Sequence, residues 1–107
     1  MVTLNLDKIF NPKSVAIIGA SDKEGSVGYA IVKNLTELGY AGKVYLVNLR
    51  KPEILGMKTY QKIEQIPEAI DLAMIATPAK TVPDVMEECG RAGVKGVIIV
   101  SAGFKET

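Results

Sequence analysis

Residues 14–31 read SVAIIGASDKEGSVGYAI and combine a short apolar run, a loop with three glycines and the start of an amphipathic segment. The unbroken aliphatic residues over 14–19 predict a strand that is covered on both faces. The segment 26–38 has helical spacing of apolar residues, and Gly39 directly after it is typical of a helix end. The apolar face of this predicted helix consists of Val27, Ala30, Ile31, Leu35 and Leu38. A strand, a glycine loop and a helix in this order predict the first unit of an α/β fold.

Three more short apolar runs, at 43–48, 71–76 and 97–101, predict three further buried strands. A second helix is predicted between the last two runs. Its apolar stripe consists of Val82, Val85, Met86 and Cys89.

The ends of this second helix also have sequence signals. Thr81 and Asp84 have the spacing of a capping box, and Pro83 is compatible with a first helical turn. Gly90 and Gly93 predict where the helix ends.

The stretch between residues 49 and 69 is less regular. Pro52 and Gly56 frame a predicted loop, 57–60 predicts a short strand, and 63–66 predicts one helical turn. Near the start of the chain, residues 6–10 predict a small helix that packs against the sheet.

The alternation of strands and helices predicts one α/β domain over residues 1–107. We expect a Rossmann-like, doubly wound and mainly parallel sheet flanked by helices. Residues 97–107 finish a strand and begin what resembles another crossover helix. We therefore expect a C-terminally truncated piece of a longer chain. Its uncovered edge strand would permit a homo-oligomer in isolation.

The composition excludes several classes of function. The chain has 107 residues, 48% of them hydrophobic, and a formal net charge of +1. This balance argues against nucleic acid or a membrane as partner, so any anion site is local. The single cysteine cannot form an internal disulfide and no apolar run approaches a bilayer span, so we expect a cytoplasmic protein. The chain has no histidine and only one cysteine, which excludes a Ser–His or Cys–His pair and a zinc site within it.

The glycine loop is the candidate anion site. Gly19, Gly25 and Gly28 permit positive φ and a close approach of ligand to backbone. The following helix start offers unpaired N–H groups and a partial positive charge. Ser21 can donate a hydrogen bond, and Lys23 can supply a cation to a diphosphate. A glycine-rich turn without a ligand is the alternative interpretation.

The spacing of these glycines does not fit an NAD fingerprint. That motif has G-x-G-x-x-G and an acid about 20 residues later, whereas here the glycines follow G-x5-G-x2-G. The second strand ends with Asn48 and is followed by Leu49, Arg50 and Lys51, which include two cations and no acid. These cations would attract a phosphorylated ribose. NADP and coenzyme A (CoA) both meet this description. A P-loop is not supported, because the sequence lacks the Gly-Lys-Ser/Thr triplet of that motif.

Longer segments carry a family resemblance. IFNPKSVAIIGASDKEGSVGYAIVKNL, GKVYLVN and TPAKTVPDVMEECGRAGVKGVIIVSAGFKET resemble the CoA-binding domain of NDP-forming acyl-CoA synthetases. The similarity is greater to the ADP-forming acetyl-CoA synthetase α subunit than to the succinyl-CoA synthetase α subunit. It runs from about Leu6 to the last residue.

The resemblance implies a CoA site at the carboxyl ends of four strands. The loop 21–25 would wrap the diphosphate, and Lys51 or Arg50 would face the adenosine phosphate. Residues 77–79 would form an apolar shelf for the adenine or pantetheine arm, and residues 101–103 would approach the thiol end. The implied CoA-binding residues are Gly19, Ser21, Asp22, Lys23, Glu24, Gly25, Gly28, Asn48, Lys51, Pro78, Ala79, Ser101, Ala102 and Gly103.

The resemblance also implies a reaction and partners. Enzymes of this kind convert acyl-CoA, ADP (or GDP) and phosphate into acid, CoA and nucleoside triphosphate through a phosphohistidine. Without histidine this chain is not a complete catalyst, so we expect it to work with phosphohistidine and ATP-grasp domains or subunits. We assign no catalytic or metal-binding residue. The alternatives are an NAD(P)-binding module, such as a redox sensor, and a non-catalytic interaction protein.

Overall fold

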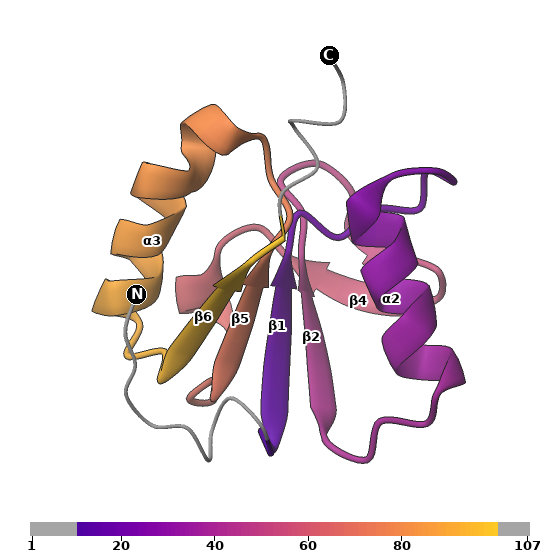
Figure 1. Ribbon diagram of the computed structural model, residues 1–107, viewed down its shortest axis with the longest axis horizontal. Helices are drawn as coiled ribbons and strands as arrows, with labels where there is room; N and C mark the ends of the chain where they lie inside the picture. Colours follow the sequence, from indigo (N-terminus) through magenta and orange to yellow (C-terminus); the bar gives the residue numbers. More distant parts are fainter. Residues whose placement is uncertain (1–10, 101–107) are drawn as a thin grey trace.

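The computed structural model describes residues 11–100, which form a six-stranded sheet with helices on both faces (Figure 1). The strands are β1 (Ser14–Ile18), β2 (Lys43–Val47), β3 (Glu53–Ile54), β4 (Met57–Tyr60), β5 (Leu72–Ile75) and β6 (Gly96–Ile99). The α-helices of the described part are α2 (Val27–Glu37) and α3 (Val82–Arg91), and the 3-10 turns are η1 (Ile63–Gln65) and η2 (Ala79–Thr81). The four predicted buried strands are present, with boundaries within two residues of the expectation.

The strand order is β3-β4-β2-β1-β5-β6, and every pairing is parallel except that of β3 with β4. The chain builds outward from β1 to β2 and β4, then returns to the other side of β1 for β5 and β6. This reversal makes the junction of β1 and β5 a topological switch point, where open α/β sheets bind ligands at the carboxyl ends of the strands. The predicted doubly wound, mainly parallel α/β fold is confirmed.

The core has two layers because residues of each strand point alternately to opposite faces. Ile17 packs with Ile31 and Val32 of α2 on one face. Ala16 and Ile18 pack with Cys89 and its neighbours of α3 on the other. Figure 1 shows α2 and α3 on opposite faces of the sheet. All five residues of β1 are buried, which explains its continuous apolar sequence.

Helix α2 is capped at both ends. The Ser26 hydroxyl accepts a hydrogen bond from the Tyr29 N–H, and Gly39 has φ +74° at the other end. Two residues of the predicted apolar face are wrong: Ala30 is exposed, and Leu38 forms the C-cap and is 81% exposed. Val32, which the prediction left out, is fully buried in its place.

The start of α3 differs from the prediction. Thr81 precedes the helix, but its hydroxyl donates to the Pro78 carbonyl oxygen and contacts the Thr77 hydroxyl, so the predicted capping box does not form. The η2 turn directly before α3 brings these two partners within reach of Thr81. Gly90 lies inside α3, and Gly93, with φ +78°, follows its end.

The region predicted as a loop after β2 contains a short antiparallel hairpin of β3 and β4. Leu55 and Gly56 form its turn with φ +51° and +80°, the conformation of a type I′ turn. The predicted strand at 57–60 is confirmed as β4, and the predicted helical turn is η1. The predicted helix at 6–10 lies outside the described residues.

Candidate functional site

The loop between β1 and α2 is anchored to the neighbouring strand. The N–H groups of Gly19 and Ala20 both donate to the Val47 carbonyl oxygen, at 3.1 and 3.2 Å. Gly19 and Gly25 have φ values of +97° and +92°, so the predicted positive φ is confirmed at both. Ser26 stabilises the far end, because its hydroxyl donates to the Lys23 carbonyl oxygen at 2.8 Å.

Gly28 has a different role from the other two glycines of this loop. A Cβ atom at this position would lie 2.0 Å from the Gly19 carbonyl oxygen. Only glycine therefore permits the first turn of α2 to pack this closely on the end of β1. This contact holds the amino end of α2 at the carboxyl edge of the sheet, where its N–H groups can meet an anion.

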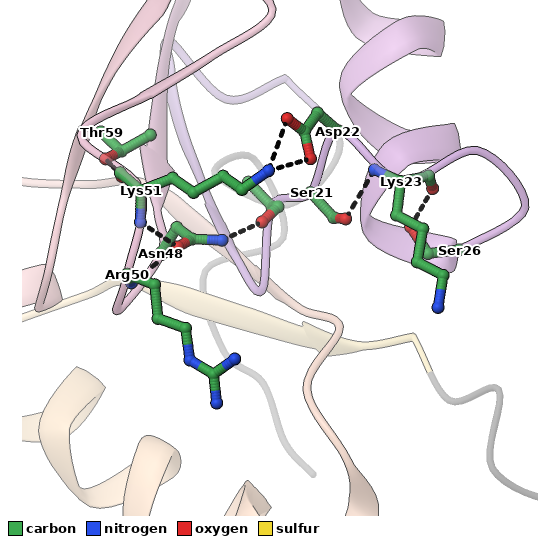
Figure 2. Close-up of polar contacts among 9 residues, drawn as sticks. Ser21, Asp22, Lys23, Ser26, Asn48, Arg50, Lys51 and Thr59 are labelled. Atoms are coloured by element: carbon green, nitrogen blue, oxygen red, sulfur yellow. Dashed lines mark hydrogen bonds and ion pairs between the residues drawn. The ribbon is translucent and has the colours of Figure 1, made fainter.

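The loop after β2 is connected to the β1 loop by Asn48. The Asn48 side-chain Nδ2 donates to the Ala20 carbonyl oxygen at 2.9 Å. Its Oδ1 accepts hydrogen bonds from the backbone N–H groups of Arg50 and Lys51, each at 2.8 Å. One side chain thus sets the turn after β2 and binds it to the loop after β1 (Figure 2).

An ion pair makes a second connection between these loops. Lys51 Nζ lies 3.0 and 2.9 Å from the two carboxylate oxygens of Asp22. The hydrogen bond to Lys51 holds the pKa of the Asp22 carboxyl below its usual value. Thr59 of β4 supports the same turn, because its hydroxyl donates to the Lys51 carbonyl oxygen.

A cleft of about 500 Å³ opens at the carboxyl edge of the sheet. One wall is formed by residues 18–21 after β1, a second by residues 47–50 after β2, and a third by residues 76–78 after β5. Thr81 of η2 closes the side together with Asp84, Val85 and Glu88 of α3. The cleft therefore lies at the topological switch point.

The cleft has cations and carboxylates on different elements. Arg50 and Lys62 line it from the chain between β2 and η1, whereas Asp84 and Glu88 line it from α3. In Figure 2 the Arg50 guanidinium points away from the Asp22–Lys51 pair, while Lys51 points toward Asp22. Arg50 and Lys51, which follow β2 in succession, thus occupy different surroundings.

The structure brings part of the predicted site together. Gly19, Ser21, Asn48 and Pro78 line the cleft, and Arg50 lines it as well. The predicted residues that do not line it are Asp22, Lys23, Glu24, Gly25, Gly28, Lys51 and Ala79. Figure 2 shows the Lys23 side chain directed away from the Asp22–Lys51 pair. Ser101, Ala102 and Gly103 lie outside the described residues, so their predicted role stays a prediction.

The sequence-based prediction left out several cleft residues. Leu49 lines the cleft with a side chain that is 70% exposed, and Gln61 and Lys62 line it from the segment after β4. Asp84 and Glu88 line it from α3. Asp84 and Glu88 follow Thr81 by three and seven residues, a spacing that places side chains on one face of a helix. This spacing was the sequence signal that could have identified them.

Two candidate chemistries have no support in the described part of the chain. Within residues 11–100, no group of three or more histidine, cysteine, aspartate or glutamate side chains is placed to hold a metal ion. Cys89 is buried in the core, where desolvation, with a smaller contribution from Glu88, raises the pKa of its thiol to about 11.

The helices of residues 11–100 include none that is long and apolar enough to cross a membrane.

The comparison with protein families is decisive. A family described as CoA binding domain matches residues 13–107. The chain belongs to this CoA-binding domain family. The predicted resemblance is thereby confirmed, and it covers nearly all of the chain.

Several curated relatives of this CoA-binding domain are named ADP-forming acetate–CoA ligases. The α subunit of ADP-forming acetate–CoA ligase I of Pyrococcus furiosus is 53% identical over 107 residues, which cover 96% of this chain and 23% of that protein. ADP-forming acetate–CoA ligase I of Archaeoglobus fulgidus is 52% identical over 101 residues, which cover 94% of this chain and 14% of that protein. The CoA-binding domain thus spans less than a quarter of the length of these two relatives.

Solved structures agree with this similarity. Dinucleotide-forming acetyl-coenzyme A synthetase 1 of Ca. Korarchaeum cryptofilum, in complex with phosphate and ADP, matches with a TM-score of 0.88 at 39% identity, over 95% of this chain and 22% of that one. A conserved hypothetical protein of Pyrococcus furiosus matches with a TM-score of 0.75 at 30% identity, over 82% of this chain and 74% of that one. The fold of the CoA-binding domain therefore occurs in long synthetase chains and in a chain of similar size.

Proposed function

We propose that this domain binds CoA in the cleft at the carboxyl edge of its sheet. The observation that carries the proposal is the joined pair of loops after β1 and β2, which present glycine backbone and Arg50 to a cleft of about 500 Å³. A cleft of this volume is in the usual range for small-molecule sites. Membership of the CoA-binding domain family supports the choice of ligand.

In this proposal the loop after β1 holds the diphosphate. The first N–H groups of α2 and the Ser21 hydroxyl would donate to phosphate oxygens, and Lys23 would add a cation. The Ser21 oxygen already accepts the Lys23 N–H at 2.9 Å, which leaves its own hydroxyl proton as the donor. Asp22, Glu24 and Gly25 complete the proposed loop around the diphosphate.

The other parts of CoA would contact the remaining walls. Arg50 is the cation of its turn that lines the cleft, whereas Lys51 is paired with Asp22. We therefore assign Arg50 to the ligand phosphates first and Lys51 second. Pro78 and Ala79 would form the apolar shelf, and residues 101–103 would approach the thiol end.

The proposal extends to a whole enzyme. By similarity to relatives named ADP-forming acetate–CoA ligases, we propose that the domain serves a cytoplasmic synthetase that converts acyl-CoA, ADP and phosphate into acid, CoA and ATP. The chain contains no histidine, so the phosphohistidine would come from another domain, and the nucleotide site from an ATP-grasp domain or subunit.

Calorimetric titration of the 107-residue chain with CoA, dephospho-CoA, NAD and NADP tests the binding proposal. We expect CoA to bind with a Kd in the micromolar range or weaker, because part of the site would come from other domains. This Kd corresponds to a binding free energy of about −8 kcal/mol or weaker. Neither NAD nor NADP should compete with CoA. Binding of NADP without binding of CoA would replace the proposal with the NAD(P) alternative.

The role of Lys23 is tested with a matched variant. Lys23→Ala should weaken CoA and dephospho-CoA alike by about 1–3 kcal/mol, because both ligands contain the diphosphate. Lys95→Ala removes the same charge from the opposite end of the sheet, where the Lys95 N–H is bonded to the Ile70 carbonyl oxygen, and should change neither affinity. Equal effects of the two substitutions would remove Lys23 from the site.

A further inference from the structure

A second concavity adjoins the cleft on the β4 side of the sheet. Its volume is about 370 Å³, and Arg50, Lys51, Lys58, Tyr60, Gln61 and Gln65 line it. Arg50 and Gln61 also line the main cleft, so the two hollows share a wall. We call this second hollow the basic pocket.

The basic pocket carries positive charge. Three of its lining residues are Arg or Lys, and none of them is Asp or Glu. Asp22 neutralises part of the charge, because it is paired with Lys51. Glu53 lies opposite Lys58 in the β3–β4 ladder but does not line the pocket. Within residues 11–100, neither Arg50 nor Lys58 forms an ion pair with an acidic side chain.

Lys58 is positioned by its neighbours. Its Nζ lies 4.9 Å from the centroid of the Tyr60 ring, and Tyr60 packs edge-on against Tyr45. Thr59 lies between Lys58 and Tyr60 in β4. Its N–H donates to the Pro52 carbonyl oxygen at 3.0 Å, directly after the turn that carries Arg50. The strand that carries Lys58 and the turn that carries Arg50 are thus joined directly.

The amides of the pocket add neutral donors. The Gln65 Oε1 accepts the backbone N–H groups of Gln61 and Lys62, at 3.0 and 3.4 Å. Because the amide oxygen is committed to these contacts, Nε2 is the group that Gln65 can offer to a ligand. The pocket therefore combines guanidinium, ammonium and amide donors, the set that a phosphate group binds.

We infer that Lys58 of β4 is a specificity residue of the proposed CoA site, whose ammonium binds the 3′-phosphate on the ribose of CoA in the basic pocket that Arg50 and Lys51 also line. This inference rests on the proposed function. A monoester carries up to two negative charges at neutral pH and suits several side-chain cations, whereas the main cleft offers backbone N–H groups to the diphosphate. Arg50, in the shared wall, would contact the ligand where it passes from one hollow to the other.

The experiment compares CoA with dephospho-CoA, which lacks only this phosphate, on four forms of the chain. These are the unchanged protein, Lys58→Met, Lys58→Arg and Lys95→Met, each checked for folding by thermal unfolding. We expect the ratio of the two affinities to fall about tenfold in Lys58→Met, through weaker CoA binding alone. The ratio should be kept in Lys58→Arg, which retains the charge, and in Lys95→Met, which loses an equal charge elsewhere.

The outcomes separate the inference from the proposed function. If the unchanged protein binds neither ligand, the proposed function fails. If it binds both equally, or if Lys58→Met keeps the full ratio, CoA binding stands and the basic pocket is not the monoester site. Added inorganic phosphate should weaken CoA binding more than dephospho-CoA binding, and an equal effect on both would place free phosphate elsewhere and overturn the inference.

Discussion

Lys51 and Asp22, which follow neighbouring strands, form an ion pair in which the Lys51 ammonium contacts both oxygens of the Asp22 carboxylate, at 3.0 and 2.9 Å. Both side chains are partly exposed, at 54% and 37%. The pair therefore contributes little to the free energy of unfolding. It does determine that Lys51, of the two cations in the turn after β2, is already bound to a carboxylate. That difference separates Lys51 from Arg50.

Removal of this ion pair should change the titration of Asp22. In Lys51→Met we expect the pKa of the Asp22 carboxyl to rise toward its usual value, because the hydrogen bond from Lys51 is what mainly lowers it. Carboxyl carbon NMR against pH measures this directly, and Lys95→Met serves as the control without an effect. Since the pKa in the folded state is lowered, the pair stabilises the fold above the usual carboxyl range. This contribution is lost as the pH falls through the lowered pKa.

Asn48 is expected to contribute more to stability than the exposed ion pair. Asn48→Ala removes the bond to the Ala20 carbonyl oxygen and leaves the N–H groups of Arg50 and Lys51 without their acceptor. We expect a loss of about 1–2 kcal/mol in the free energy of unfolding, measured with urea. Asn48→Asp keeps the acceptor oxygen and should lose less. The assignment fails if both variants are as stable as the unchanged protein.

Two glycines form a matched pair for substitution. In Gly28→Ala the new methyl would lie 2.0 Å from the Gly19 carbonyl oxygen, so the start of α2 must move, and we expect a loss of about 2–4 kcal/mol. Gly90 lies inside α3 and a methyl there meets open space. Gly90→Ala should therefore raise stability by about 0.5–1 kcal/mol. Thermal unfolding of both variants would contradict the packing argument if the two shifts had the same sign.

Cys89 should be unreactive in the folded protein. Burial raises the pKa of its thiol to about 11, so at pH 8 almost no thiolate is present and the sulfur is covered. A chromogenic disulfide reagent should react only after urea unfolds the chain. Because the folded pKa is raised, the stabilisation from Cys89 is complete below the usual thiol pKa of 9.0. It decreases as the pH rises toward about 11.

Much of the fold was predictable because the relevant signals are local. Continuous apolar runs predicted the central strands, and glycines at strand and helix ends predicted the turns. The β3–β4 hairpin was missed because Leu55 takes the left-handed conformation of its turn, where Gly, Asn or Asp is the usual signal. The prediction placed Leu38 rather than Val32 on the buried face of α2, because helical spacing alone does not show where this helix leaves the sheet.

The candidate site was predictable in part. The two loops at the carboxyl ends of β1 and β2 were predicted, since both carry turn or polar residues after apolar runs. The choice between Arg50 and Lys51 depends on which cation Asp22 engages, a contact between residues 29 positions apart. The contribution of Asp84 and Glu88 depends on how α3 lies beside the cleft, which is a matter of tertiary packing.

The contact of Lys51 with Asp22 across the two loops has a consequence for chimeras made within this family. The Gly19 and Ala20 N–H bonds to the Val47 carbonyl oxygen join backbone atoms and would persist in an exchange, whereas the Lys51–Asp22 ion pair needs a particular side chain in each segment. A graft from a relative that transfers residues 19–26 alone would inherit a mismatched neighbour. The two stretches, 19–26 and 47–51, form one exchangeable cassette and should be transplanted together.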